Sequence, residues 1–387
     1  MEYHRSYTVS SSSHSNHLTS QSVPSLNNSH SSTTNYHCLT TLKTHTSYIS
    51  SVTLSGKFLY TGSSDRQITS WNRIPFQLTE NSTANSIVVA GKGAVKSLVV
   101  SSNKLFSAHQ DHKIRVWKIT DSNSNHHDSE HQKYTHLATL PTLGDRASKV
   151  LIPKNHVQIR RHKKCTWVHH VDTVSSLALS KDGTLLYSVS WDRTVKIWRA
   201  KDFTCLESLT NAHDDAINAV AVSYDGLVYT GSADKKIKVW KKGEGEKKHG
   251  LVDTLEKHNS GVNALALSSD ETVLYSGACD KCILVWEKED GKMVVVGALR
   301  GHTKSILCLG VVANLVCSGS ADKTIRVWRG VDRGEYDCLA VLEGHRGSVK
   351  CLTAVLDHSS DSQPSFLVYS ASLDCDIKVW QIFVPAI

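Results

Sequence analysis

The chain has 387 residues, 40% of them hydrophobic, and its 44 Lys and Arg residues exceed its 36 Asp and Glu residues to give a formal net charge of +8. No apolar run is long enough to cross a membrane, and the first residues lack the apolar core of a signal peptide. We therefore expect an intracellular protein, cytoplasmic or nuclear or both, without membrane contact. Its ten scattered cysteines are typical of reduced thiols in such a compartment.

Residues 1–35 have an unusual composition. They are rich in Ser, Asn, Thr and His, contain few large apolar side chains, and carry Glu2 and Arg5 as their formal charges. Such a segment cannot bury enough apolar surface to offset the entropy that is lost on ordering. The sequence therefore predicts a disordered tail over residues 1–35, followed by one domain over residues 36–387.

The rest of the chain contains one pattern seven times. Each copy begins with Asp and ends with Trp, and apolar residues at alternate positions between them predict a β-strand. A Ser or Thr stands four residues before every Asp, and six copies have a His further upstream. The copies are His45, Thr61, Asp65 and Trp71; Ser107, Asp111 and Trp117; His170, Ser188, Asp192 and Trp198; His213, Thr230, Asp234 and Trp240; His258, Ser276, Asp280 and Trp286; His302, Ser318, Asp322 and Trp328; and His345, Ser370, Asp374 and Trp380. A repeat of about forty residues is typical of one four-stranded blade of a β-propeller.

These repeated polar residues have a structural explanation. A blade in a propeller is buried on both faces, so each polar side chain inside it needs a hydrogen-bond partner. We expect each Asp to accept hydrogen bonds from the His ring and from the hydroxyl, and the hydroxyl to accept one from the Trp indole. The alternative is that the Asp and His residues are catalytic or bind metal. Seven copies around a ring favour the structural network, because site chemistry needs one copy.

The pattern resembles the WD-repeat family across almost the whole chain. This resemblance implies an all-β fold, a seven-bladed β-propeller. The last copy ends at Trp380, which leaves too few residues for an outer strand, whereas Tyr36–His45 matches the segments Cys205–His213 and Cys338–His345 that precede later copies. We therefore expect the amino-terminal strand to complete the last blade and close the ring.

The second copy departs from the pattern, because Gly91 stands where the other copies have His. We expect its polar network to be one member short and its blade to be the least rigid. Two insertions follow: Thr120–Tyr134 is interpreted as a polar loop, His136–Leu140 as an outer strand, and residues 141–165 as a second insertion. This second insertion occupies the loop that leads to the next His, so we expect it on the face where the His and Asp turns meet. Propellers usually engage partners on that face.

The second insertion is basic. Between Asp145 and Lys164 it has seven Lys and Arg residues against one Asp, so most of the net charge of the chain lies there. Such a patch attracts phosphate or carboxylate groups over about one Debye length, roughly 8 Å at physiological salt. A solvated loop kept soluble by its charges explains the composition equally well. The alternation in Val157–Arg161 indicates a short extra strand.

Trp191 lies directly before Asp192 and is not part of the repeat, since none of the other six copies has Trp at this position. A Trp in a turn is a candidate anchor for a partner, although it could instead pack under the insertion. The residue after the Asp is Arg, Lys or His in six copies. We hypothesise that an acidic or phosphorylated segment of a partner protein is bound by Arg160, Arg161, Lys163, Lys164, Trp191 and Arg193.

Two groups of residues could hold a metal ion but have simpler explanations. Cys279 and Cys282 form a CxxC without a second pair, and the repeat places them on either side of the turn at Asp280. His126, His127 and His131 lie in a polar loop of a His-rich protein. The sequence therefore predicts no metal site and no cofactor.

Two stretches are similar to a narrower group, the plant JINGUBANG-type WD-repeat proteins. They are Arg160–Ser180 with Leu185–Arg199, and Ala212–Val220 with Tyr229–Trp240. In that group a Ser-rich tail precedes a seven-bladed propeller with the same insertion after the second repeat. The resemblance implies a non-enzymatic regulator that acts through protein partners such as transcription factors, in the context of pollen germination and development.

Three classes of function fit these features. The first is a monomeric adaptor or scaffold that binds other proteins through its face and its basic insertion. The second is a substrate receptor of a cullin-type ubiquitin ligase, a role for which some WD-repeat proteins use an acidic residue just after the Trp and an Arg three places beyond the Trp. None of the seven copies has that combination. The third is nucleic-acid binding through the insertion, where aromatic stacking residues are sparse apart from Trp167.

An enzyme fits least well. The chain has no Gly-rich phosphate loop, no nucleophile elbow and no spaced set of metal ligands. We therefore expect no catalytic residues and no small-molecule substrate.

Overall fold

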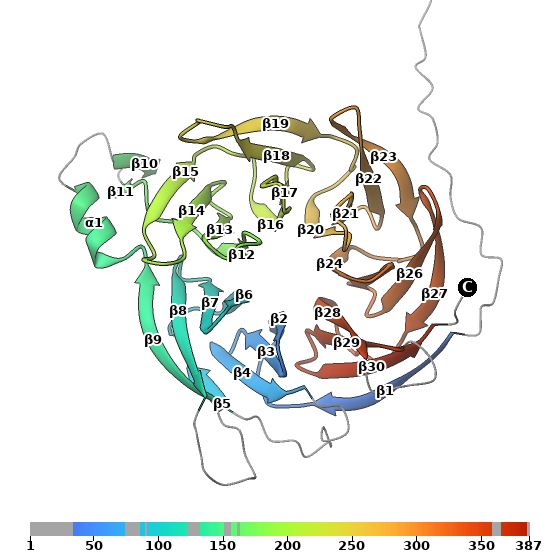
Figure 1. Ribbon diagram of the computed structural model, residues 1–387. Coiled ribbons are helices and arrows are strands. Elements are labelled where there is room, and N and C mark those ends of the chain that lie inside the picture. Colours follow the sequence, from blue (N-terminus) through green and yellow to red (C-terminus); the bar gives the residue numbers. More distant parts are fainter. Residues whose placement is uncertain are drawn as a thin grey trace, which may run out of the picture.

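The computed structural model describes residues 34–73, 86–89, 91–121, 132–150, 156–160, 163–357 and 365–384. Residues 1–33, nearly all of the predicted tail, lie outside the described residues. Seven antiparallel sheets of four strands follow one another around a central axis (Figure 1). This arrangement confirms the predicted all-β fold, a seven-bladed β-propeller. In the described part of the chain, no helix has the length and apolar character needed to cross a membrane.

In each blade the strands run from the axis outward in chain order, except that blade seven borrows its outer strand from the start of the chain. Blade one contains β2 (Ile49–Ser55), β3 (Phe58–Ser63), β4 (Gln67–Asn72) and β5 (Ser86–Val89). Blade two contains β6 (Val95–Ser101), β7 (Lys104–His109), β8 (Ile114–Asp121) and β9 (Gln132–Leu140). Blade three contains β12 (Val174–Leu179), β13 (Leu185–Ser190), β14 (Val195–Arg199) and β15 (Cys205–Leu209).

The remaining blades repeat this order. Blade four contains β16 (Ile217–Val222), β17 (Val228–Ser232), β18 (Ile237–Lys242) and β19 (His249–Leu255). Blade five contains β20 (Val262–Leu267), β21 (Val273–Ala278), β22 (Ile283–Glu289) and β23 (Lys292–Leu299). Blade six contains β24 (Ile306–Val312), β25 (Leu315–Ser320), β26 (Ile325–Asp332) and β27 (Glu335–Leu342). Blade seven contains β28 (Val349–Asp357), β29 (Ser365–Ser372), β30 (Ile377–Phe383) and β1 (Asn35–Leu42).

The apolar core lies between neighbouring blades, because each sheet is covered on both faces. The second strand of a blade is buried along its length, as in β25, where every residue is buried. Trp380 of blade seven belongs to the same apolar cluster as Val327 and Cys317 of blade six. A single blade could not bury these faces, so each blade depends on its neighbours for stability.

The ring is closed by pairing the two ends of the described chain. β1 lies antiparallel to β30, with Cys38 opposite Trp380 and Thr41 opposite Lys378. Leu42 at the end of β1 is 2% exposed, and the Nζ atom of Lys378 donates a hydrogen bond of 3.0 Å to the hydroxyl of Thr41. The expected closure by the amino-terminal strand is confirmed.

The outer hairpin of blade two is longer than expected. β8 runs to Asp121 and β9 begins at Gln132, so the expected loop over Thr120–Tyr134 shrinks to the residues between these strands. Those residues, which include His126, His127 and His131, lie outside the described residues. The Oε1 atom of Gln132 accepts hydrogen bonds from the hydroxyl groups of Tyr60 and Tyr134, at 2.8 and 2.6 Å. The contact with Tyr60 ties the start of β9 to blade one.

The second insertion lies outside the ring, beside β9 and β15 (Figure 1), so its expected position over the face is wrong. Its first part is the helix α1 (Leu143–Val150). Asp145 in this helix is buried, and its Oδ2 atom accepts a hydrogen bond of 3.2 Å from the backbone N–H of Cys205 in β15. An outer strand has unpaired backbone groups at its edge, and a carboxylate satisfies such an N–H well. The insertion begins on the expected face, but this contact directs it outward, away from that face.

The second part of the insertion is a two-stranded hairpin. β10 (His156–Arg160) pairs antiparallel with β11 (Lys163–Thr166). The extra strand expected at Val157–Arg161 is thus one half of a hairpin. Its partner strand had no apolar alternation to reveal it in the sequence.

Candidate interaction face

In six blades the repeated polar residues form one chain of hydrogen bonds. The Nδ1 atom of each His lies 2.8–3.1 Å from an Asp carboxylate oxygen, and its Nε2 atom lies 2.8–2.9 Å from the Ser or Thr hydroxyl. In all seven blades the Trp indole N–H donates to that hydroxyl over 2.8–3.2 Å. The His separates the Asp from the hydroxyl, so the expected direct bond between these two groups is wrong.

The network determines the charge of its members. Burial opposes ionisation of the carboxyl groups, but hydrogen bonds from His213 and Thr324 lower the pKa of Asp234 and Asp322 to about 2. Burial lowers the pKa of His170 and of His302, despite the carboxylate beside each ring. The pairs therefore combine an ionised Asp with a neutral His, in which Nδ1–H donates to the carboxylate and Nε2 accepts from the hydroxyl.

Blade two completes its network with two other side chains. His109, at the end of β7, lies with its Nε2 atom 2.8 Å from the Ser107 hydroxyl and its Nδ1 atom 3.2 Å from the carbonyl of Gly93. Asp111 is bonded by Arg115 instead of a His, with N–O distances of 3.0 and 2.5 Å. The expectation of a missing member is wrong. The signal overlooked in the sequence was His109, which replaces the Ser found two residues before the Asp in five other copies.

The turn after the second strand has the same conformation in every blade. The residue after each Asp has φ between 67° and 75°, the left-handed region that favours Gly or Asn. Six of the seven residues there are nevertheless Arg, Lys or His with exposed side chains. We call this set the turn ring, and the face that carries it the turn face; the set is Arg66, His112, Arg193, Lys235, Lys281 and Lys323, with Cys375 as the seventh member. Local backbone preference does not explain these long basic side chains.

The predicted partner-binding residues fall in two separate places. Trp191 and Arg193 lie in the turn after β13 on the turn face. Trp191 is 42% exposed, and its backbone N–H donates to the carbonyl of Thr173. The hairpin β10–β11, which contains Arg160, Lys163 and Lys164, lies outside the ring (Figure 1). Arg161 lies outside the described residues. The structure therefore does not bring the hairpin and Trp191 into one site.

A buried lysine holds the end of the insertion. Lys196 in β14 is 1% exposed, and its Nζ atom donates to the carbonyl of Trp167 at 2.5 Å and to the Ser208 hydroxyl at 2.7 Å. Trp167 directly follows β11. Asp145 at the start of the insertion and Trp167 at its end are thus both tied to blade three.

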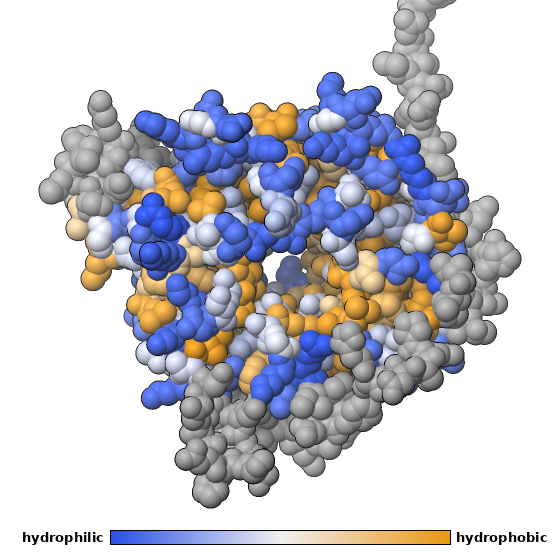
Figure 2. All heavy atoms as spheres, viewed as in Figure 1, coloured by the Kyte–Doolittle hydropathy of each residue, from blue (hydrophilic) through white to orange (hydrophobic). Residues whose placement is uncertain are grey.

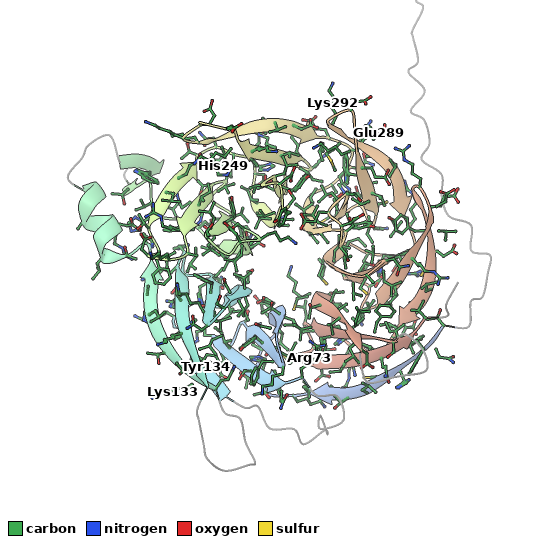
Figure 3. All side chains as sticks on the ribbon, in the orientation of Figure 1. Arg73, Lys133, Tyr134, His249, Glu289 and Lys292 are labelled. Atoms are coloured by element: carbon green, nitrogen blue, oxygen red, sulfur yellow. The ribbon has the colours of Figure 1, made fainter. Side chains whose placement is uncertain are left out.

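The outer strands of blades three and four are also linked. Glu207 of β15 is buried, and its carboxylate accepts a hydrogen bond of 2.9 Å from the backbone N–H of His249 in β19. The His249 ring nitrogen Nδ1 lies 2.7 Å from the other carboxylate oxygen. Figure 3 shows His249 in the outer part of the ring, where these two blades meet. This pair fixes the two outer strands relative to each other.

The CxxC residues lie where the repeat places them, on either side of the turn at Asp280. Asn263 Nδ2 lies 3.2 Å from the sulfur of Cys279, and Arg300 Nη1 lies 3.1 Å from that of Cys282. Burial raises the pKa of the Cys282 thiol. Among the residues that the structure describes, no three His, Cys, Asp or Glu side chains are grouped so that they could hold a metal ion.

The ring of seven blades, with one polar network repeated around it and an opening at its centre (Figure 2), defines a repeat β-propeller. Six segments match the family described as "WD domain, G-beta repeat", namely residues 36–72, 162–199, 203–241, 250–287, 293–329 and 336–381. The chain therefore belongs to the WD40 repeat family, and this membership implies a protein-interaction scaffold. The matches omit blade two, in which His109 and Arg115 replace the usual His.

Several curated proteins are similar to the chain. Cell division control protein 4 of Saccharomyces cerevisiae is 27% identical over 49% of the chain and 26% of its own length. The 66 kDa stress protein of Physarum polycephalum is 27% identical over 88% of the chain and 47% of its own length. The human kinesin-like protein KIF21B is 25% identical over 90% of the chain and 20% of its own length. The chain thus spans about half or less of the length of these relatives.

Proposed function

We propose that the protein is a non-enzymatic adaptor whose turn face holds an acidic or phosphorylated segment of a partner protein. The turn ring carries this proposal. Six basic side chains project from positions at which a non-Gly residue costs about 1 kcal/mol of backbone strain relative to Gly. A face lined by charges of one sign attracts partners of the opposite sign and speeds their association.

Trp191 supports the same proposal. It is exposed on the turn face two residues from Arg193, so an aromatic anchor stands beside a cation. The basic hairpin, outside the ring next to blade three, would form a second contact with the same partner. The two contacts would then engage different parts of a partner segment that crosses the edge of the ring.

The experiment is partner capture with matched charge reversals in the full-length chain. One variant changes Arg193, Lys235 and Lys323 to Glu, and a second changes Arg160, Arg161, Lys163 and Lys164 to Glu. The control changes Lys242 and Lys248 to Glu, which are exposed at the opposite end of blade four. We expect partners identified by mass spectrometry to be lost from the first variant, reduced in the second and retained by the control. Equal capture by all three proteins would reject the proposal.

The cellular context is proposed from likeness alone. The similarity of Arg160–Ser180 and Ala212–Val220 to JINGUBANG-type proteins supports a plant regulator that acts through transcription factors in pollen. The names of two relatives offer a different context, since one is a cell division control protein and one a stress protein. The partners recovered in the capture experiment decide between these contexts.

Nucleic-acid binding is the second candidate, because the turn ring and the hairpin are both basic. A complex held mainly by phosphate contacts weakens steeply as the salt concentration rises, and the slope depends on the number of counterions released on binding. Titration of the chain with single-stranded and double-stranded DNA at low and physiological salt tests this candidate. The absence of measurable affinity at low salt would eliminate it.

A further inference from the structure

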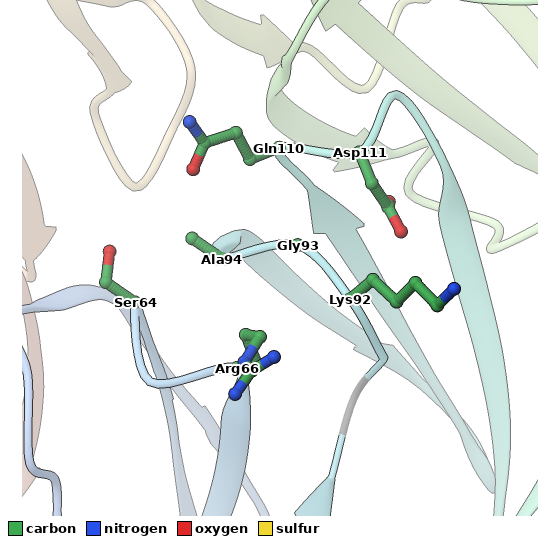
Figure 4. Close-up of a pocket in the computed structure, with 7 residues that line it drawn as sticks. All are labelled: Ser64, Arg66, Lys92, Gly93, Ala94, Gln110 and Asp111. Carbon is green, nitrogen blue, oxygen red and sulfur yellow. The ribbon is translucent and has the colours of Figure 1, made fainter.

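The turn face is hollowed between blades one and two (Figure 4). An open depression of about 470 Å³ is lined by Ser64 and Arg66 of blade one and by Lys92–Ala94 and Gln110–Asp111 of blade two. This volume falls in the range of small-ligand pockets. We call it the inter-blade depression.

The loop of blade two that lines the depression requires glycine twice. Gly91 has φ of 110°, and a Cβ atom there would lie 2.7 Å from Cζ of Arg115. A Cβ atom on Gly93 would lie 2.6 Å from the backbone nitrogen of Asp111. The guanidinium of Arg115 therefore lies against Gly91, which stands where six other copies have His. Lys92 is the one residue with a side chain between Gly91 and Gly93.

The charge under the depression also differs from that in the other blades. Six blades keep one negative charge at this position, because the Asp is bonded to a His and not to a cation. In blade two both carboxylate oxygens of Asp111 are bonded by the guanidinium of Arg115. His109 below it is held neutral by burial, which lowers its pKa to about 4. An anion in this depression therefore meets one negative charge less than it would above any other blade.

Two cations border the depression. The side chains of Arg66 and Lys92 are exposed, one from each blade, and neither has an ion-pair partner among the described residues. Asp111, the one carboxylate in the lining, is already neutralised. The depression thus has two available positive charges and is large enough to admit a phosphorylated side chain.

We infer that the inter-blade depression binds the phosphate group of a phosphorylated Ser or Thr in the partner's segment. This inference rests on the proposed function of the turn face. A phosphorylated side chain carries about −1.5 to −2 charges at pH 7, which matches two cations. Arg66 can bond two phosphate oxygens through its fork of N–H groups, and Lys92 adds a compact charge on the other side. A Glu carboxylate has one charge and engages one of the two cations.

The test measures binding of a short fluorescent phosphoserine peptide to the full-length chain by anisotropy. The same peptide with Ser or with Glu at that position provides the comparison. We expect the phosphoserine peptide to bind more tightly than either. Arg66→Gln with Lys92→Gln should weaken its binding at least about tenfold, which corresponds to about 1.4 kcal/mol.

The matched control is Lys242→Gln with Lys248→Gln. It also removes two exposed charges, but at the opposite end of blade four, away from the turn face. We expect a change of less than about twofold. All four residues are exposed, so both double variants should melt at the temperature of the parent chain.

Three results would overturn the inference: no binding of the phosphoserine peptide, equal loss in both double variants, or equal affinity for the Glu peptide. Binding of a single-stranded oligonucleotide that depends on Arg66 and Lys92, without peptide binding, would assign the depression to nucleic acid instead. The proposed function is judged separately by partner capture. Capture that needs Arg193, Lys235 and Lys323 while the peptide ignores Arg66 and Lys92 would keep the turn face and reject the depression.

Discussion

The Nη2 atom of Arg115 lies 2.5 Å from the Oδ2 atom of Asp111, in the place where six other blades have a His–Asp pair. The Asp111 side chain is 22% exposed and that of Arg115 is 11% exposed, so the pair is largely removed from water. This ion pair fixes the turn of blade two. In the other blades a neutral His ring, hydrogen-bonded to the Asp, fixes the equivalent turn.

Removal of Arg115 should destabilise the protein more than loss of a surface ion pair. Arg115→Met leaves Asp111 with a partly buried charge and should lower the free energy of unfolding by about 2 kcal/mol, less than for a fully buried pair. Urea denaturation measures this change. Arg115→Met combined with Asp111→Asn should recover part of the loss, because no unpaired charge remains. Arg199→Met, which breaks an exposed pair with Asp202, should have little effect.

The shared hydroxyl of each network is expected to be critical. Ser318→Ala leaves both the indole N–H of Trp328 and the Nε2 atom of His302 without a partner in the interior. We expect a loss of about 3 kcal/mol in urea denaturation. Ser318→Thr keeps the hydroxyl, and blades one and four already have Thr61 and Thr230 at this position. A Thr variant as unstable as the Ala variant would show that side-chain volume, and not hydrogen bonding, governs the site.

Stability should fall as the pH is lowered from 6.5 towards 4. The pKa of His109 is lowered to about 4 by burial and by Arg115, and those of His170 and His302 are lowered by burial. Between these values and the ordinary pKa near 6.5, the unfolded chain binds protons that the folded chain does not, so acid favours unfolding. Below about pH 4, protonation of Asp234 and Asp322 removes further stability. Urea denaturation at pH 7.5, 6.5, 5.5 and 4.5 measures the slope, and a flat profile would contradict this account. His109→Asn should make the slope shallower, and His170 and His302 should account for the slope that remains.

The closing strand should contribute to the stability of the whole ring. A chain that starts at residue 43 lacks β1, exposes the edge of β30 and leaves the cluster around Leu42 open. We expect a loss of about 4 kcal/mol, judged from the apolar area that Leu39 and Leu42 no longer cover, and self-association through the free strand edge. Thermal melts and light scattering after gel filtration measure both effects. A chain that starts at residue 34 serves as the control and should match the full-length chain.

The contact between Asp145 and Cys205 should keep the insertion against blade three. Asp145→Ala removes the carboxylate that caps the N–H of Cys205, and should raise the rate of tryptic cleavage within residues 146–164 several-fold. Asp202→Ala alters an exposed carboxylate near the start of the same strand and should leave the rate unchanged. Equal rates in the Asp145→Ala variant and the parent chain would mean that Lys196 and Trp167 suffice to hold the insertion.

The sequence predicted the features of the fold that repeat in every blade, but not the features that occur in one blade. The strands, the blade number and the pairing of β1 with β30 follow from a pattern that is present seven times, so one irregular copy could not obscure it. His109 and Arg115 were missed because they rebuild the network from other positions, and residue identity does not reveal which atoms meet. The outward turn of the insertion was missed for a similar reason, since it depends on one contact between residues sixty positions apart, Asp145 and Cys205.

The pairing of β1 with β30 also has a consequence for biosynthesis. β1 leaves the ribosome before the other described strands, and its partner strand, residues 377–383, follows all of them. At about 5–20 residues per second, roughly 20 to 70 seconds of translation separate the two strands. During that time Leu39 and Leu42 have no sheet to join. The nascent chain can stack its inner blades but cannot close the ring. A chaperone that shields β1 until β30 has emerged would therefore protect the open ring while its last blade is incomplete.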